Sequence, residues 1–166
     1  AMTMKEDLLR AAAVNSAYAK KLVADIPDDQ MAAQPAPGMN HAAWVLGHLT
    51  FVADSMIRVF DQPFSMSKEW IELFNLASKP TAERARYPSK AELWDAYEKA
   101  YARLTAAVEA ASSESLAREF PNPKLRTMLP TVGVAMVHIL TSHHALHLGQ
   151  LSAWRRALGM PPAGTP

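Results

Sequence analysis

Apolar residues recur at helical spacing along four long stretches of the chain, and segments that contain proline separate these stretches. The first stretch runs from about residue 4 to residue 24. The prolines and the glycine of residues 27–39 then break helical structure. Asn40 follows at the position of a helix N-cap, and the second stretch runs from His41 to Phe60. No stretch of this length alternates apolar and polar residues, so the pattern predicts helices and no sheet.

The section that follows the second stretch has a weaker pattern. We expect residues 64–88 to form a connection with one short helix at residues 68–76. Ser89 and Glu92 have the spacing of a capping box, in which the side chain of each residue accepts a hydrogen bond from the backbone N–H of the other. This box predicts the start of a third long helix, which continues to about residue 111.

The last long stretch opens after a second irregular segment. Residues 112–129 are expected to form a loop with one helical turn. Thr131 caps a fourth helix that continues to Leu158, where Gly159 and two prolines end it. Together the four helices predict an all-α fold, a four-helix bundle with an elaborated middle connection, formed as a single domain by residues 2–166.

Charge and composition exclude several classes of protein. Seventeen Lys and Arg residues against sixteen Asp and Glu residues give a net charge of +1 with mixed signs, which provides no basic face for nucleic acid. Residues 128–154 carry no acidic residue, lysine or arginine, but they contain four histidines, which a lipid-facing helix does not tolerate. The sequence contains no cysteine and no signal-like segment, so we expect a cytoplasmic protein without a membrane span.

Two histidines lie on the apolar face of the last helix. An α-helix turns by 100° per residue, which places His143 and His147 one turn apart in the middle of its only strongly apolar stripe. The same geometry places His138 on the opposite side and His144 near the edge of the stripe. Because two buried imidazoles cost several kcal/mol unless their nitrogens find partners, the pair indicates either a shared metal ion or a polar cluster satisfied by water and carbonyls.

A third histidine lies on a core face of the second helix. His48 stands at the centre of an apolar face that includes Trp44 and Val52. His41 shares this face, but it lies two turns away, about 10.5 Å along the axis, and is expected to be an exposed residue or a helix-end residue. Three imidazoles from two helices favour a metal site over the polar cluster.

The expected site is open and rich in nitrogen ligands. His48, His143 and His147 are its ligands, and no fourth protein ligand stands nearby, so one or more coordination positions would remain for water or substrate. Imidazole nitrogens favour zinc, nickel or iron over calcium or magnesium. Gln150, Trp44 and Trp154 are candidates for the surroundings of the open position, although both tryptophans also have the spacing of core residues.

Two motifs give the chain a resemblance to a known family. Residues 35–40 followed by Trp44-Val-Leu-Gly-His48, and the stretch His143-His-Ala-Leu-His147-Leu-Gly-Gln150, resemble the second and last helices of the DinB-like (YfiT-like) superfamily. The resemblance implies an up-down-down-up bundle, a metal site on the same three histidines, and a homodimer. His144 stands where many members of the family have a glutamate.

Three functions remain open at this stage. Some members of the family resemble metal-dependent transferases that activate a low-molecular-weight thiol, so the resemblance implies a similar enzyme acting on a small-molecule substrate. The absence of cysteine fits this hypothesis, because the thiol would come from outside the chain. A metal-dependent hydrolase is a variant of it. The second possibility is a non-catalytic bundle that binds a metal or another ligand, and the third is a helical interaction module without a metal.

Overall fold

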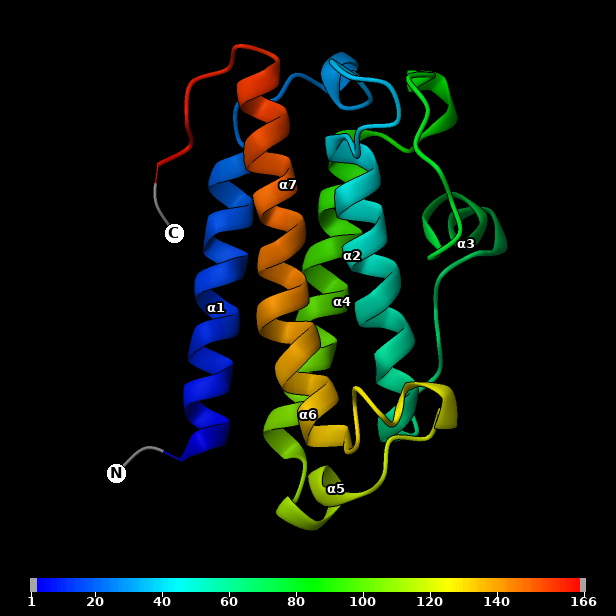
Figure 1. The fold of residues 1–166 in the computed structure, drawn as a ribbon, viewed down its shortest axis with the longest axis vertical. Coiled ribbons are helices and arrows are strands. Elements are labelled where there is room, and N and C mark those ends of the chain that lie inside the picture. Colours follow the sequence, from blue (N-terminus) through cyan, green and yellow to red (C-terminus); the bar gives the residue numbers. More distant parts are fainter. Residues whose placement is uncertain (1–2, 165–166) are drawn as a thin grey trace.

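Four long helices run side by side in the computed structural model, which describes residues 3–164 (Figure 1). They are α1 (Met4–Val23), α2 (Ala42–Met56), α4 (Lys90–Ala110) and α7 (His144–Ala157). The first helix runs up in Figure 1, α2 and α4 run down, and α7 runs up again. Residues 3–164 contain no strand, so the all-α bundle and its up-down-down-up order are confirmed.

The helix ends follow the capping residues of the sequence with one exception. Thr3 and Ser89 form capping boxes at α1 and α4, and Thr131 caps α6 (Val132–Val137). The exception is α2, where His41 is the N-cap in place of Asn40 and its ring accepts a hydrogen bond from the backbone N–H of Trp44. The side chain of Asn40 is instead used in a contact with the last helix.

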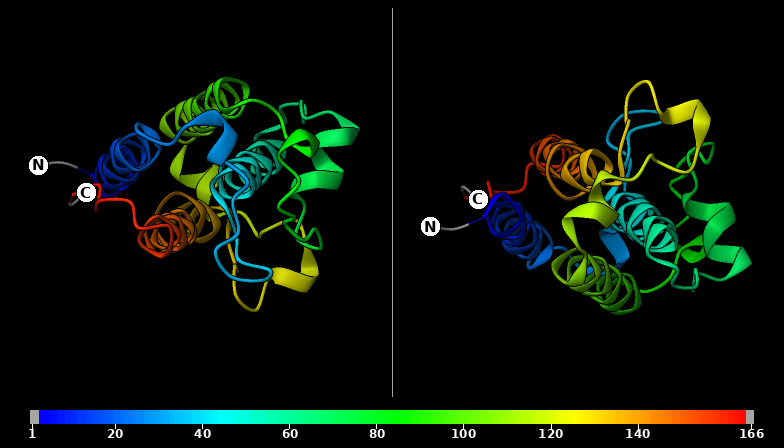
Figure 2. Two further views of the ribbon diagram at one scale, coloured as in Figure 1. Left: turned by 90° about the horizontal axis from the view of Figure 1, so that it is seen from above. Right: turned by 90° about the horizontal axis from the view of Figure 1, so that it is seen from below.

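The connection between α2 and α4 is long for a topological reason. Both helices run in the same direction, so the chain must return along the bundle, a distance of roughly 25 Å for a helix of this length. After η2 (Ile57–Phe60), which prolongs α2, the chain returns on the outer side of α2 (Figure 2) through two short helical elements, α3 (Lys68–Phe74) and η3 (Arg84–Arg86). The predicted short helix is therefore present, although it ends at Phe74.

The position of α2 explains its composition. It packs against α4, α7 and α3, and these neighbours leave little of its surface to solvent. Ala42–Phe60 is long and apolar enough to cross a membrane, yet 72% of its most apolar window is buried inside the bundle. Its apolarity is accounted for by burial on several sides. No other helix of residues 3–164 meets the same test of length and composition.

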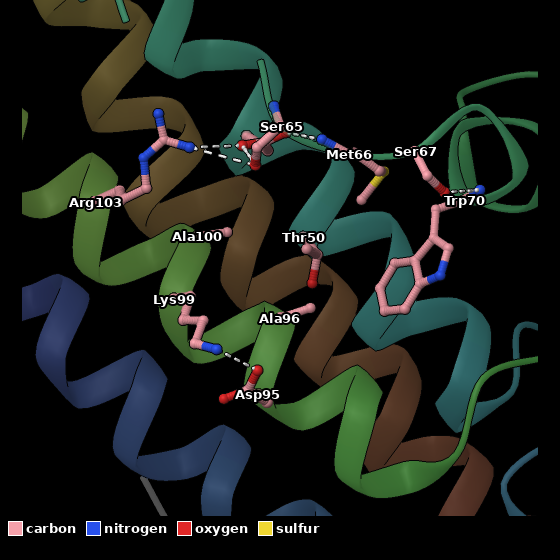
Figure 3. Close-up of a pocket in the computed structure, with 11 residues that line it drawn as sticks. Thr50, Ser65, Met66, Ser67, Trp70, Asp95, Ala96, Lys99, Ala100 and Arg103 are labelled. Atoms are coloured by element: carbon pink, nitrogen blue, oxygen red, sulfur yellow. Dashed lines mark hydrogen bonds and ion pairs between the residues drawn. The ribbon is translucent and has the colours of Figure 1, made fainter. Parts of the chain in front are cut away.

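A buried carboxylate fastens the middle connection to the bundle. Asp54 of α2 is 3% exposed, and its oxygens accept hydrogen bonds from the backbone N–H groups of Ser65 and Met66, both at 2.9 Å. Arg103 of α4 completes the cluster with an ion pair to Asp54 at 3.2 Å. Figure 3 shows Arg103 reaching from α4 toward Ser65. The start of the connection that leads into α3 is thus tied to two helices of the bundle.

The irregular segment before the last helix is more structured than the sequence predicts. One helical turn was expected between residues 112 and 129, whereas the structure contains α5 (Ser113–Ala117) and η4 (Pro123–Leu125). Asn122 caps η4 through its side chain, and Pro123 stands at the first helical position, where proline is favoured. Both elements are too short to show a repeating apolar pattern in the sequence, and a few local hydrogen bonds are enough to form them.

The fourth predicted helix contains a π-helical segment. The chain runs without a break through α6, the π-helix η5 (His138–His143) and α7, which ends before Gly159 at φ 73°. A π-turn bonds residue i to i+5 and so contains one residue more than an α-turn. Side chains beyond η5 are therefore rotated about the helix axis by one residue, roughly 100°, relative to their positions in an uninterrupted α-helix. This displacement buries His144, which the sequence places at the edge of the apolar stripe.

Asn15 of α1 satisfies carbonyl groups of the π-helical segment. Its side-chain amide donates to the carbonyl oxygens of Leu140 at 3.2 Å and Thr141 at 3.1 Å. A π-turn interrupts the regular i to i+4 hydrogen bonds, and partly buried carbonyls need other donors. The two amide hydrogens of Asn15 supply them from a helix 125 residues away.

We expect Asn15→Ala to lower the free energy of unfolding by about 1–2 kcal/mol, because two carbonyls then lose a donor. Urea unfolding followed by circular dichroism measures this change. Val14→Ala is the matched control, since Val14 is a half-exposed neighbour on the same helix and should change stability by less than about 0.5 kcal/mol. Equal effects of the two substitutions would contradict the role of Asn15.

Candidate metal centre

Three histidines converge between α2 and the last helix. His48, His143 and His147 each offer one ring nitrogen, and these nitrogens all lie within 4.8 Å of one another. The ring centroids are 4.6 Å apart for His143 and His147, 4.8 Å for His48 and His147, and 5.6 Å for His48 and His143. This is the triad that the sequence indicates, and it could hold a metal ion.

Two of the three rings are held by hydrogen bonds that leave their other nitrogen free. Nδ1 of His48 lies 2.8 Å from the carbonyl oxygen of Phe74, and a carbonyl can only accept, so Nδ1 carries the proton. Nδ1 of His147 lies 2.9 Å from Oε1 of Gln150, which also accepts from the amide of Asn40 at 3.0 Å. Nε2 of both rings then has a lone pair available for a cation.

The third ring lacks such a partner. Nδ1 of His143 is buried and makes no hydrogen bond. Burial of an unsatisfied polar atom is costly, and it is rare in native structures unless an ion, a ligand or water completes the site. A self-sufficient polar cluster would leave no such nitrogen unsatisfied, and the two fixed tautomers keep Nε2 of His48 and His147 free for a cation, so the site fits a bound metal ion better.

Burial keeps the triad in the neutral form that a metal ion requires. Desolvation lowers the pKa of His48 to about 4 and the pKa of His143 to about 3, and it also lowers the pKa of His147. The neighbouring imidazole of His147 lowers the first two further, because adjacent positive charges repel. All three rings are therefore unprotonated near neutral pH.

We expect the affinity for Zn²⁺ or Co²⁺ to fall less between about pH 8 and about pH 6 than the affinity of a site made of exposed histidines. Protons compete with a metal only as the pH falls toward the pKa of the ligands, and burial moves those pKa values below the usual 6.5 of histidine. Dissociation constants measured across this range by competition with a chromophoric chelator test the prediction. A steep loss of affinity that begins near pH 6.5 would show that the rings titrate as exposed histidines.

The structure places two of the three residues expected around the open position beside the triad. Trp44 stacks on His48 with a centroid distance of 4.5 Å and an angle of 7°. Gln150 bonds His147 and borders a hollow of about 280 Å³, which is also lined by Gly38, Met39, Asn40 and Ala153. The structure does not bring Trp154 to the triad, because it lies two turns beyond His147, where its indole N–H donates to the carbonyl of Ala33 at 2.7 Å.

His41 is a buried structural residue. The sequence leaves it as an exposed residue or a helix-end residue, and it is the latter but not exposed. Its Nε2 lies 2.9 Å from the carbonyl of Thr81, so Nε2 carries the proton and Nδ1 is free to cap α2. Thr81 belongs to the middle connection, which the sequence does not place against the start of α2.

His144 faces α4, away from the triad. Its Nε2 lies 2.6 Å from the hydroxyl of Tyr97, and its ring stacks on Tyr101 at 4.3 Å. Tyr97 and Tyr101 stand one turn apart on the core face of α4, a spacing that could have indicated a partner for a buried polar group. Sequence reasoning missed these tyrosines because it placed His144 at the edge of the stripe.

His138 lies beside His143, and its expected position on the opposite side of the helix is wrong. The π-helical segment brings residues i and i+5 to one face, so the two ring centroids are 5.8 Å apart. In a regular α-helix these residues would be separated by about 140° around the axis. His138 is partly buried, and its Nδ1 lies 2.9 Å from the hydroxyl of Ser142.

The fold and the triad together define a helical bundle with a candidate metal centre of three histidines between the second and the last long helices. The sequence profile of the DinB superfamily matches residues 14–151, and the chain belongs to this superfamily. The crystal structure of a conserved protein from Enterococcus faecalis is similar in fold, with a TM-score of 0.74 and 21% identity over 96% of this chain and 99% of that one. No curated protein matches the chain.

Proposed function

We propose that this protein binds one divalent transition-metal ion on His48, His143 and His147 and uses it to transfer an external low-molecular-weight thiol to a small electrophilic substrate. The observation that carries the proposal is the convergence of three ring nitrogens within 4.8 Å, two of them with Nδ1 held by an acceptor. Three neutral nitrogen donors suit zinc, nickel or iron.

The composition of the triad supports an open site. Among the described residues, the group that could hold a metal consists of three histidines and includes no carboxylate or cysteine. Closed structural zinc sites use four protein ligands, whereas catalytic sites keep a position for a small molecule. A divalent ion in such a site lowers the pKa of a thiol or of water bound to it.

Residues around the triad would orient and shield the bound molecules. Trp44 covers one face of His48 and shields it from water. Gln150 keeps His147 in the correct tautomer, and Asn40 fixes the amide of Gln150 in turn. The hollow beside Gln150 has room for a small molecule, and Gln150 links it to His147, although the triad histidines themselves do not line it.

The composition of the site also ranks the alternatives. A metal-dependent hydrolase needs a general base to take the proton of water, and the metal-capable group contains no carboxylate for this purpose. The thiol reaction requires no protein nucleophile, which agrees with a sequence that has no cysteine. A non-catalytic metal-binding bundle requires only the triad. The experiment must therefore distinguish the transferase from this alternative.

The test uses protein purified without chelator or nickel resin. Plasma mass spectrometry measures metal per chain, and glutathione is then added to the cobalt-substituted protein while sulfur-to-cobalt charge-transfer absorption is recorded. Near-stoichiometric metal, a new absorption band and metal-dependent conjugation of glutathione to chlorodinitrobenzene support the proposal. Metal binding without any response to glutathione, cysteine or dithiothreitol would contradict the transferase and favour the non-catalytic bundle. A folded protein that takes up no metal would overturn both.

A further inference from the structure

The three histidines of the triad differ in what holds their second nitrogen. His48 has the carbonyl of Phe74, and His147 has the amide oxygen of Gln150, so both rings are fixed in orientation and tautomer. His143 has no such partner, although its Nδ1 is buried. Metal-ligating histidines in proteins nearly always donate their outer N–H to an acceptor. With Nε2 of His143 toward the metal, as in the other two rings, its Nδ1 would be an outer N–H without an acceptor.

The ring of His138 lies next to the ligand that lacks a partner. The π-helical segment starts at His138 and ends at His143, and it places their centroids 5.8 Å apart. An N–H···N hydrogen bond between two imidazoles needs a centroid separation of about 5 Å, the sum of a bond of about 3 Å and about 1 Å to each ring centre. His138 is partly buried, and a rotation of its side chain would close this difference.

The hydrogen bonds of His138 leave the correct nitrogen free. Nδ1 of His138 lies 2.9 Å from Oγ of Ser142, and that hydroxyl donates its own hydrogen to the carbonyl of His138 at 3.3 Å. Oγ can therefore only accept from Nδ1, which must carry the proton. Nε2 of His138 is then an acceptor, which is what the outer N–H of a metal-bound His143 requires.

We propose that His138 is a positioning residue for the metal site, which accepts a hydrogen bond from Nδ1 of His143 when a metal is bound. This inference rests on the proposed metal binding and adds the third outer partner to Phe74 and Gln150. It also gives the π-helical segment a role. Such segments are rare and occur frequently at functional sites, and this one brings together two histidines that an α-helix would separate.

The test measures metal affinity in a set of matched variants. His138→Ala is expected to weaken binding of Co²⁺ or Zn²⁺ by 10- to 100-fold, the usual effect of removing an outer partner. His138→Gln retains an acceptor oxygen and should recover part of the loss. Val137→Ala, at the exposed neighbouring position, should bind as the wild type does. The urea unfolding midpoints of the metal-free variants should stay close to that of the wild type, so that a loss of affinity is not a loss of folding.

The outcomes separate this inference from the proposed function. Metal affinity of His138→Ala equal to that of the wild type would overturn the positioning role and leave the metal site intact. X-ray absorption that shows one imidazole fewer on the metal in His138→Ala would also overturn it, because His138 would then be a ligand itself. An equal loss in His138→Ala and His138→Gln would argue against an acceptor role. A wild type that binds no metal would overturn the inference and the proposed function together.

Discussion

Replacement of His147 by alanine is expected to weaken the binding of Zn²⁺ or Co²⁺ by more than about 100-fold. Loss of an outer hydrogen-bond partner typically costs 10- to 100-fold in metal affinity, and loss of one of only three ligands must cost more. The substitution also leaves Gln150 and Asn40 without the ring that they orient. Isothermal titration of the metal-free protein, or competition with a chelator, measures the effect.

The matched control for this prediction is Leu146→Ala. Leu146 precedes His147 on the same helix, but its side chain is 58% exposed and should have no influence on the metal. Circular dichroism of both variants without metal verifies that the bundle remains folded. If His147→Ala retained the metal of the wild type, the ion would have to be held elsewhere, and the assignment of the triad would be wrong.

Asp54→Ala is expected to lower the free energy of unfolding by about 3–4 kcal/mol. The substitution leaves the backbone N–H groups of Ser65 and Met66 without their acceptor and removes the carboxylate partner of Arg103, which keeps only the carbonyl of Pro63 and the hydroxyl of Ser65. Removal of one partner from a buried ion pair costs 3–5 kcal/mol, and the partial exposure of Arg103 reduces the loss. Urea unfolding at neutral pH, followed by circular dichroism, gives the value.

Asp95→Ala provides the contrast. Asp95 pairs with Lys99 on the same helix as Arg103 (Figure 3), but both side chains are mostly exposed, and such a pair contributes less than about 0.5 kcal/mol. Both substitutions remove one negative charge, but only Asp54 is buried, so the difference between them measures the effect of burial. Similar effects of the two substitutions would show that Asp54 does not fasten the connection. A weaker affinity for metal in Asp54→Ala alone would show that the fastening also reaches His48 through α3.

Local signals predicted most of the helical framework. The four apolar stripes and the caps at Ser89 and Thr131 depend on residues close in sequence, so they can be recognised without the fold. His48, His143 and His147 could be assigned for the same reason, because each stands at the centre of an apolar face. Their convergence follows once α2 and the last helix pack together.

The parts that sequence reasoning missed depend on distant partners. No glycine or proline marks residues 138–143 as π-helical, and the amide that satisfies their carbonyls comes from Asn15 on another helix. His41 is buried because Thr81 of the middle connection bonds its ring. A helical wheel contains neither contact, so it placed His138 on the wrong side of the helix and His144 only at the edge of the apolar stripe, and it did not reveal that His41 is buried.

The Phe74 carbonyl has a consequence for attempts to rebuild this site in a simpler scaffold. The middle connection would be the first part to be shortened in a minimal bundle, since it contributes none of the three triad histidines. Yet it supplies the acceptor for His48, and the ring of Phe74 lies so close to Gly47 that a Cβ there would be 2.3 Å from it. A transplant of the three histidines alone would therefore carry over the ligands and lose the orientation of one of them.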